Sequence, residues 1–413
     1  MENNTVWTKN FKLITLSTII FAIAGEAINL PLSLLVFDET KSTFLSAILI
    51  ISGMLPDVII PIFIAPFIDR YSKKKLVIYL FTLMTFTYLL FAFIIRRISF
   101  VYNAYLIFSL VVGTISVIFR LAYQAWYPDL IPIGFEHKGY AVASTIYPTV
   151  MIVMAPVATY LYEHLHISTI FFIVVALMIL CIVSLIFIDN DTTEDTERKV
   201  SFDFNEYKSD IKAGFTYLKQ ENGIRNIYTY MGITNGTGFG SQMMVQAYFQ
   251  TAAFLSTTML GFLRSAETIG RTIGGVVQYR ITIPREKKYN ITKFVYTVYN
   301  FMDMILLFMP YPLMLINRFC VGFLGISSAT IRESSVNSYL PANMRAKVNA
   351  VFNVILSFAM IIMQIFSGLL GDKFSYRLVC VIMSLIGFLG IFIFIVLPSN
   401  ENRKVYESTR VEA

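Results

Sequence analysis

The chain contains 413 residues, of which 56% are hydrophobic and only 14% are charged, whereas roughly a quarter of the residues in an average soluble domain are charged. This composition excludes an ordinary soluble domain, and the 36 Phe and 24 Tyr exclude an intrinsically disordered chain. The strands of a membrane β-barrel alternate over about ten residues, but 48–67 and 169–188 are nearly continuous apolar runs. An all-α polytopic membrane protein is therefore expected.

The net charge of +7 is explained by where the basic residues lie. Arg70 with 73–75, and Arg285 with 287–288, sit in short loops between apolar runs, where positive charge marks the cytoplasmic side of a membrane protein. These clusters are interpreted as topology signals. No nucleic-acid partner is expected.

The sequence lacks the usual motifs of enzymes and metal sites. Cys181, Cys320 and Cys380 lie far apart inside apolar runs, so they predict neither a disulfide framework nor a metal site. His164 and His166 form an H-x-H pair without further ligands nearby, which is a weak zinc signal. The sequence contains no Walker loop, H-E-x-x-H or G-x-S-x-G motif. We expect no enzyme, no metal and no other cofactor.

Apolar runs long enough to cross the roughly 30 Å hydrocarbon layer recur along the whole chain. The first run has only Glu26 and Asn29 as strongly polar interruptions and is too long for a usual cleaved leader, so it is predicted to span the membrane. Twelve transmembrane helices are predicted, over residues 11–37, 44–67, 76–95, 100–124, 139–162, 168–188, 224–251, 256–280, 293–309, 312–335, 345–370 and 377–397.

The basic residues also predict the orientation of these helices. With the amino terminus in the cytoplasm, most of the lysines and arginines outside the spans fall on the cytoplasmic side, and Arg96 with Arg97 is a local misfit. Both termini are therefore predicted to be cytoplasmic. The expected location is the cell membrane, as a multi-pass protein of the bacterial plasma membrane, and nothing in the sequence requires more than a monomer.

The spans divide the chain into two halves. Residues 1–188 are predicted to form an N-terminal six-helix bundle, 189–223 a cytoplasmic linker, 224–398 a C-terminal six-helix bundle and 399–413 a cytoplasmic tail. In the linker, Ile211, Phe215 and Leu218 recur at helical spacing, which favours a short amphipathic helix over an unstructured charged segment.

The two halves show a weak internal repeat. The second and eighth spans both end in an arginine, Arg70 and Arg280, and the fourth and tenth spans end in Arg120 and Arg332, each followed by polar residues and proline. Repeats with the same orientation are typical of transporters whose two bundles flank a substrate path. Chance similarity between apolar segments is the alternative.

Residues 65–74, between the second and third spans, resemble the loop signature of the major facilitator superfamily, G-x-x-x-D-R-x-G-[RK]-[RK]. Asp69, Arg70, Lys73 and Lys74 match this signature, whereas Ala65 and Ser72 replace its two glycines. The remaining sequence is similar to the drug-exporter branch that includes macrolide efflux proteins. The resemblance implies twelve helices in two bundles, alternating access and export.

Ala155 and Pro156 in the fifth span resemble the end of the antiporter motif of these exporters, which finishes in Gly-Pro. The replaced glycine weakens the inference of proton antiport more than it weakens the inference of the fold.

Charged side chains inside the spans are candidates for function, because an unpaired charge in the bilayer is costly. Glu26 lies near the middle of the first span, and it is the first candidate for proton coupling because desolvation favours a protonated carboxyl group. Asp57 is the second candidate. The alternative for Glu26 is a buried, hydrogen-bonded acid without a role in coupling.

Arg264, Glu267 and Arg271 in the eighth span share one helical face, because they are spaced i, i+3 and i+7. This face is predicted either to line the substrate path or to join its helix to a neighbour, with Asp303 and Glu333 as candidate external partners. Arg318 is interpreted as a residue near a helix end that extends its charge to the membrane surface.

The loop signature is predicted to act as a gating latch. Asp69 is expected to accept hydrogen bonds from the amino end of the eleventh helix, where free amides and partial positive charge gather. Arg70 is expected to meet Asp129 at the end of the fourth helix, with Lys73 and Lys74 completing the latch. The alternative is a basic loop that only sets topology.

These features predict a proton-coupled secondary transporter that exports an amphipathic drug or a related small molecule. One alternative is an exporter of an endogenous anionic or zwitterionic metabolite such as a siderophore, in which Arg264 and Arg271 recognise charge. A further alternative is a non-transporting membrane sensor built on a transporter fold. The expected partners are a small-molecule substrate, protons and the lipid bilayer.

Overall fold

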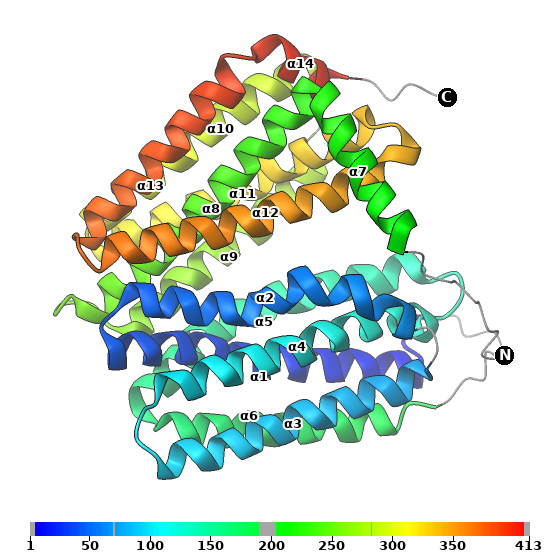
Figure 1. Ribbon diagram of the computed structural model, residues 1–413, viewed down its shortest axis with the longest axis vertical. Coiled ribbons are helices and arrows are strands. Elements are labelled where there is room, and N and C mark those ends of the chain that lie inside the picture. The colour runs from blue at the N-terminus through cyan, green and yellow to red at the C-terminus, as the bar shows by residue number, and fades with distance from the viewer. Residues whose placement is uncertain (1–4, 69–70, 190–203, 282, 409–413) are drawn as a thin grey trace. The chain divides into compact units, whose positions relative to one another are not determined.

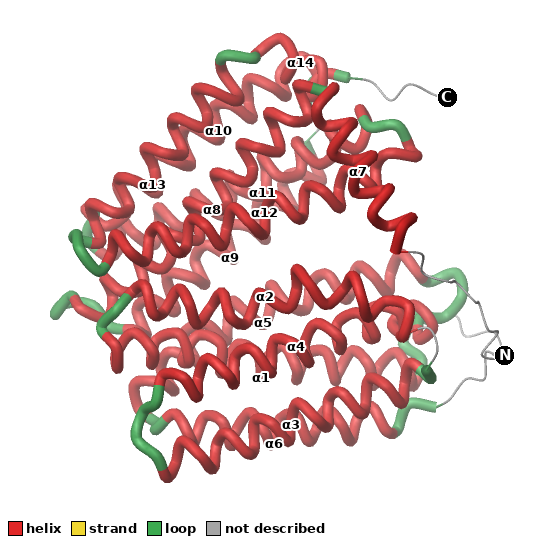
Figure 2. Tube along the Cα trace, in the orientation of Figure 1, coloured by secondary structure: helices red, strands yellow, loops and turns green. Residues whose placement is uncertain are grey.

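The computed structural model describes residues 5–68, 71–189, 204–281 and 283–408 of the chain. Within these ranges all regular secondary structure is helical (Figures 1 and 2). The chain divides into two compact units, of which unit 1 comprises Met1–Lys41 with Ile48–Phe202, and unit 2 comprises Ser42–Ala47 with Asp203–Ala413.

Unit 1 is a bundle of long helices, and the helix α2 begins in unit 2 and continues into unit 1. The elements are α1 (Lys9–Thr40), α2 (Thr43–Ile68), α3 (Lys73–Arg97), α4 (Tyr102–Trp126), the short 3-10 helix η1 (Tyr127–Leu130), α5 (Glu136–His164) and α6 (Ile167–Ile186).

Aromatic side chains fill much of the core of unit 1. Phe81 of α3 and Phe119 of α4 meet edge to face at a centroid distance of 5.1 Å, and Phe21 of α1 packs against both. Phe91 and Phe108 stack at 4.2 Å. Such aromatic pairs add to the stabilisation from burial alone, so α1, α3 and α4 have a defined mutual packing.

The described residues of unit 2 form eight α-helices together with the first turn of α2. Its elements are α7 (Phe204–Gln220), α8 (Asn222–Thr251), α9 (Thr257–Arg280), α10 (Arg285–Ile305), the 3-10 helix η2 (Leu306–Phe308), α11 (Tyr311–Tyr339), α12 (Ala342–Gly371), α13 (Tyr376–Gly390), the π-helix η3 (Ile391–Val396) and α14 (Ser399–Glu407).

Ten segments among the described residues are long and apolar enough to cross a membrane. They match ten of the twelve predicted spans, and the two that fall short are α8 and α9. The reason lies in their composition, because α8 is rich in Gly, Asn, Thr and Gln, and α9 contains Arg264, Glu267 and Arg271. These two helices are thus the predicted spans whose polar and charged residues keep them from qualifying by composition.

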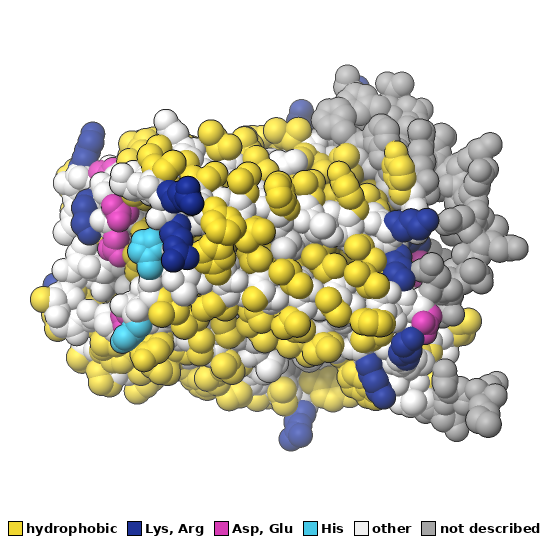
Figure 3. All heavy atoms as spheres, turned by 90° about the horizontal axis from the view of Figure 1, so that it is seen from below, with side chains coloured by type: hydrophobic (Ala, Val, Ile, Leu, Met, Phe, Trp, Pro, Cys, Tyr) yellow, Lys and Arg dark blue, Asp and Glu magenta, His cyan; other side chains and the backbone are white. Residues whose placement is uncertain are grey.

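The surface of unit 1 suits a lipid environment. Figure 3 shows a face covered largely by hydrophobic side chains, with most of the charged side chains gathered towards its two ends. Large apolar residues of α3 and α6 are exposed, among them Phe86, Leu90, Phe93, Leu180 and Val183. An exposed apolar surface of this extent is unusual in a soluble protein and fits contact with lipid tails.

The predicted amphipathic helix corresponds to α7, which packs along α12 within unit 2. Leu218 is buried, whereas Phe215 is exposed. The segment Phe204–Gln220 of the predicted linker is thus helical.

The π-helix η3 is joined to both α10 and α14 by side-chain donors. Tyr289 donates its hydroxyl proton to the carbonyl oxygen of Ile395 at 2.7 Å, and Asn402 Nδ2 donates to the carbonyl oxygens of Phe394 and Ile395 at 2.8 and 3.1 Å. A π-helix departs from the i→i−4 pattern, and these donors give its carbonyl groups additional partners.

A tyrosine pair holds α14 against the bundle. The hydroxyl groups of Tyr296 and Tyr406 lie 3.1 Å apart. Burial raises the pKa of Tyr406 well above its ordinary value.

Candidate functional site

The candidate site in unit 2 is built on the close packing of α9 against α11. A side chain at Gly322 would clash with the carbonyl oxygen of Glu267, and one at Gly270 would clash with that of Phe319. Small residues permit such close approach of two helices. The charged residues on the facing surfaces of α9 and α11 are consequently brought within reach of each other.

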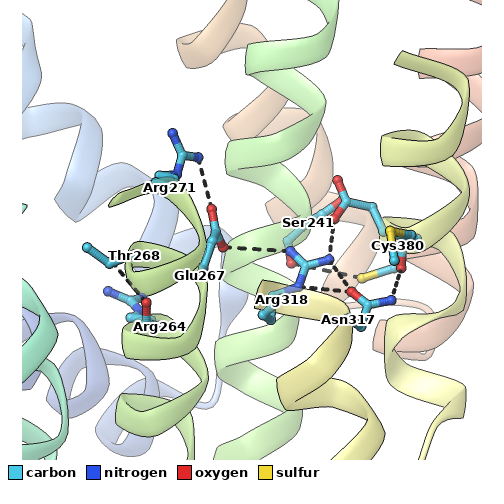
Figure 4. Close-up of polar contacts among 10 residues, drawn as sticks. Ser241, Arg264, Glu267, Thr268, Arg271, Asn317, Arg318 and Cys380 are labelled. Carbon is cyan, nitrogen blue, oxygen red and sulfur yellow. Dashed lines mark hydrogen bonds and ion pairs between the residues drawn. The ribbon is translucent and has the colours of Figure 1, made fainter. Parts of the chain in front are cut away.

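Four charged residues form an alternating chain across α9, α11 and α10, and Figure 4 labels Glu267, Arg271 and Arg318 among them. Arg271 Nη2 lies 2.9 Å from Glu267 Oε1, and Arg318 Nη1 lies 3.8 Å from Glu267 Oε2. Arg318 Nη2 lies 2.5 Å from Asp303 Oδ1. The sequence placed Glu267 and Arg271 on one face and suggested Asp303 as a partner, and Arg318 is the residue that links them.

The chain runs from a partly exposed end to a buried end. The side chain of Arg271 is 50% exposed, that of Glu267 22%, and those of Arg318 and Asp303 only 12% and 11%. Buried ions need both charge pairing and hydrogen bonds, and Arg318 receives both because its Nε and Nη2 also donate to Asn317 Oδ1. Arg271 is therefore the member most accessible to a ligand.

The interpretation of Arg318 as a residue that extends its charge to the membrane surface is wrong. Its guanidinium group is buried between carboxylates from two other helices. Two signals in the sequence were available: Asn317 precedes Arg318 as a second polar residue, and Gly322 follows one turn later. Neither identifies the partners, because contacts between helices do not follow from spacing within one helix.

Arg264 lies one turn before Glu267 on α9 and is partly buried. It belongs to the same region of the structure (Figure 4). The predicted face with three charged residues is thus present, and its central member, Glu267, is held by Arg271 and Arg318.

In unit 1, Glu26 is buried with only 6% of its surface exposed. The hydroxyl of Tyr147 on α5 donates a hydrogen bond of 2.5 Å to Glu26 Oε1. The residues near Glu26 in the sequence do not predict this partner, because Tyr147 lies 121 residues later in the chain. The arrangement suits an acid that exchanges a proton, and equally a buried acid that only joins α1 to α5.

Asp57 of α2 forms an ion pair with Arg120 of α4. Both side chains are about half exposed, at 42% and 51%. Both residues lie within predicted spans, and the sequence did not predict that they pair. Their contact means that Asp57 is balanced by a cation, whereas Glu26 accepts a hydrogen bond from the neutral hydroxyl group of Tyr147.

Part of the predicted latch can be located. Lys73 Nζ lies 2.8 Å from Asp129 Oδ2, and Lys74 Nζ donates to the carbonyl oxygen of Ile188 at 2.6 Å. Asp69 and Arg70 lie outside the described residues. Lys73 is thus a partner of Asp129, the residue that had been expected to meet Arg70.

The fold and the candidate site define a class of protein. Helices of spanning length, an apolar exposed surface and charges sheltered inside helix contacts characterise a multi-pass membrane protein with polar groups in its interior. The model of the Major Facilitator Superfamily matches residues 14–302 and 297–412. The chain belongs to this family of membrane transporters.

Solved structures of transporters share this fold. A bacterial homologue of the iron transporter ferroportin, solved in an inward-facing state, has a TM-score of 0.69 and 14% identity, covering 95% of this chain and 99% of its own. The nucleoside transporter NupG has a TM-score of 0.67 and 14% identity, covering 94% and 98%. The D-xylose-proton symporter has a TM-score of 0.65 and 11% identity, covering 95% and 98%.

No curated protein sequence matches this chain. The similarity to the solved structures, at these identities, concerns the fold alone.

Proposed function

We propose that this protein is a secondary active transporter that exports an amphipathic drug or a related small molecule by proton-coupled alternating access. The observation that carries the proposal is the pair of sheltered polar sites in a chain of this family: Glu26 with Tyr147 in unit 1, and the charged chain around Arg318 in unit 2. Export is inferred from the resemblance to drug exporters.

The proposal includes a topology. All twelve predicted spans cross the bilayer, including the polar helices α8 and α9, and both termini are cytoplasmic. Support for including α8 and α9 comes from their length, at 30 and 24 residues, since about 20 residues suffice to cross the hydrocarbon layer. Their polar side chains then face protein or the substrate path. Residues 189–223 act as the cytoplasmic linker between two transporting bundles.

In this mechanism Glu26 holds the coupling proton. Glu26 is buried, and the hydroxyl of Tyr147 donates a hydrogen bond to its carboxyl group. Binding of protons and of substrate then alternates as the bundles open to either side. Asp57 is the second candidate, and its pairing with Arg120 favours a structural role over proton coupling.

A second candidate function is export of an anionic or zwitterionic metabolite such as a siderophore. It is favoured by the half-exposed guanidinium group of Arg271 at the accessible end of the charged chain. Guanidinium groups recognise carboxylates with directed hydrogen bonds.

Purified protein in sealed vesicles with an imposed pH gradient tests these functions. A cationic macrolide-like compound and an anionic chelator serve as the two probes, and vesicles without a gradient serve as the control. Gradient-driven movement of the cationic compound supports the drug exporter, and movement of the chelator supports the second function. Binding of a probe without movement in either direction would identify a non-transporting sensor and contradict both.

A further inference from the structure

The junction of α10 and α14 carries two cations on one aromatic ring. α14 packs against α10 within unit 2 (Figure 1). The guanidinium carbon of Arg403 in α14 lies 5.2 Å from the centroid of the Tyr289 ring, and Lys293 Nζ lies 5.6 Å from the same centroid. Both distances fall within the range of cation–π contacts, which extends to about 6 Å. Two positive charges from different helices are thus held beside a single side chain.

Hydrogen bonds fix the ring and one of the cations. Tyr289 is only 1% exposed, and its hydroxyl donates to the carbonyl oxygen of Ile395 at 2.7 Å. Arg403 Nη2 donates to Asn290 Oδ1 at 3.4 Å, and the side chain of Arg403 is 46% exposed. The guanidinium group is therefore anchored on the protein and still accessible to a ligand from outside.

The surface next to this ring is predominantly positive. An open hollow of about 640 Å³ is lined by Asn400, Arg403, Lys404, Glu407 and Ser408. Its single acid is a weak partner for the cations, because Glu407 Oε1 lies 4.0 Å from Arg403 Nη1, the outer limit of an ion pair. Two cations against one acid favour an anionic ligand at this position.

The exposed face of α10 changes from polar to aromatic as the helix continues from this cluster. Exposed residues of α10 recur at i, i+4, i+7 and i+11, as Asn290, Phe294, Thr297 and Phe301, and this spacing places them on one face. Phe294 and Phe301 are 64% and 48% exposed. The hydroxyl of Thr297 between them donates to the carbonyl oxygen of Lys293 at 3.0 Å, so its polar group has a partner within the helix. Such a face suits a helix that passes from lipid head groups into acyl chains.

We propose that Lys293 and Arg403 bind the head group of an anionic phospholipid at the junction of α10 and α14, with its acyl chains lying along Phe294 and Phe301. In the proposed topology this end of α10 lies at the cytoplasmic surface, where anionic lipids are available and basic pockets between helices bind their head groups. The cations attract the phosphodiester, and the aromatic face gives the lipid an apolar contact that a soluble anion does not use.

Native mass spectrometry of the purified chain in a neutral detergent tests the site. The protein is titrated with phosphatidylglycerol, and with phosphatidylcholine as a lipid whose head group has no net charge. Lys293→Gln and Arg403→Gln should each weaken binding of phosphatidylglycerol about fivefold, the contribution of one cation near an anionic membrane surface, and should leave binding of phosphatidylcholine unchanged. Lys219→Gln removes the same charge from an exposed position of α7, and this matched control should bind both lipids as the native chain does.

Two further variants separate recognition of charge from packing. Glu407→Gln removes the acid that competes for Arg403, and it should strengthen binding of phosphatidylglycerol. Arg403→Lys keeps the positive charge and should retain more of the binding than Arg403→Gln does. If Arg403→Gln unfolds α14, the variant Lys293→Gln decides the question, because it leaves the residues of α14 unchanged.

Three outcomes would overturn the lipid site. The first is an affinity for phosphatidylglycerol that is the same in the native chain and in Lys293→Gln. The second is an equal loss of affinity in Lys219→Gln, which would indicate diffuse attraction to a basic surface. The third is displacement of the lipid by an equal concentration of inorganic phosphate, which would indicate a site for free phosphate. The titration uses neither a transported probe nor a pH gradient, so a failure of the proposed export leaves its result unchanged.

Discussion

Arg318 and Asp303 bind each other at 2.5 Å between Nη2 and Oδ1, with side chains that are only 12% and 11% exposed. Since Arg318 also contacts Glu267, one guanidinium group balances two carboxylates from α9 and α10. This relationship makes Arg318 the residue on which the charged chain depends.

Replacing Arg318 by Gln should destabilise unit 2 by about 3–5 kcal/mol, because removal of one partner leaves buried charge uncompensated. Thermal unfolding of the purified protein in detergent measures the effect. Arg285→Gln, at an exposed position in the first turn of α10, should change stability by less than about 0.5 kcal/mol. The double variant Arg318→Gln, Asp303→Asn should recover part of the loss, and a double variant no better than Arg318→Gln would contradict the pairing.

Replacing Glu26 by Gln should abolish transport driven by a pH gradient while leaving membrane insertion intact. Gln keeps the size of the side chain and an acceptor for Tyr147, but it cannot exchange a proton. Vesicle transport with and without the gradient measures the effect. Asp57→Asn is the comparison variant, since Asp57 already pairs with Arg120, and it should retain gradient dependence. Unchanged coupling in Glu26→Gln would remove this residue from the mechanism.

Replacing Asp69 by Asn should reduce transport without preventing substrate binding, if the loop signature acts as a latch. Lys73→Gln should have a weaker effect, because its pair with Asp129 is partly exposed and such pairs contribute only about 0–1 kcal/mol. Initial transport rates and equilibrium binding of the probe are measured side by side. Normal turnover in Asp69→Asn would leave the loop with only a topological role.

Replacing Gly322 by Ala should destabilise the packing of α9 on α11 by about 1–3 kcal/mol, the usual cost of overpacking. The new methyl group would meet the carbonyl oxygen of Glu267. Gly275→Ala is the control, since its Cβ atom would meet no heavy atom within 4 Å, and it should be neutral or stabilising by up to about 1 kcal/mol. Equal unfolding temperatures for the two variants would argue against the close approach of these helices.

Replacing Asn402 by Ala should cost about 1–3 kcal/mol, because buried carbonyl groups of η3 lose a donor. Asn402 has 0% exposure, whereas Asn400 in the same helix is exposed, so Asn400→Ala is the matched control. Thermal unfolding compares the stabilities of the two variants. Equal stability of Asn402→Ala and Asn400→Ala would show that the hydrogen bonds from Asn402 to η3 do not stabilise the protein.

The sequence predicted the helical architecture well, and the physical reason is that long apolar segments must be helical in a membrane. Ten of the predicted spans coincide with apolar helices of the structure. The tail from 399 was not expected to contain a helix, because α14 is short and polar and depends on its contacts with Tyr296 and η3. Helix propensity, which depends on the local sequence, does not predict such tertiary contacts.

Within the candidate site, spacing alone predicted that Glu267 and Arg271 interact, since both lie on one helix. Spacing along one helix could not predict the contacts between different helices. Tyr147 as the partner of Glu26, Arg120 as the partner of Asp57, and the central position of Arg318 each depend on which faces meet. A single sequence does not specify those faces when most residues on every face are apolar.

The contacts of α14 have a consequence for protein engineering. Tyr406 and Asn402 complete the packing around α10 and η3. A fusion that replaced α14 would therefore expose hydroxyl and carbonyl groups that are buried in unit 2.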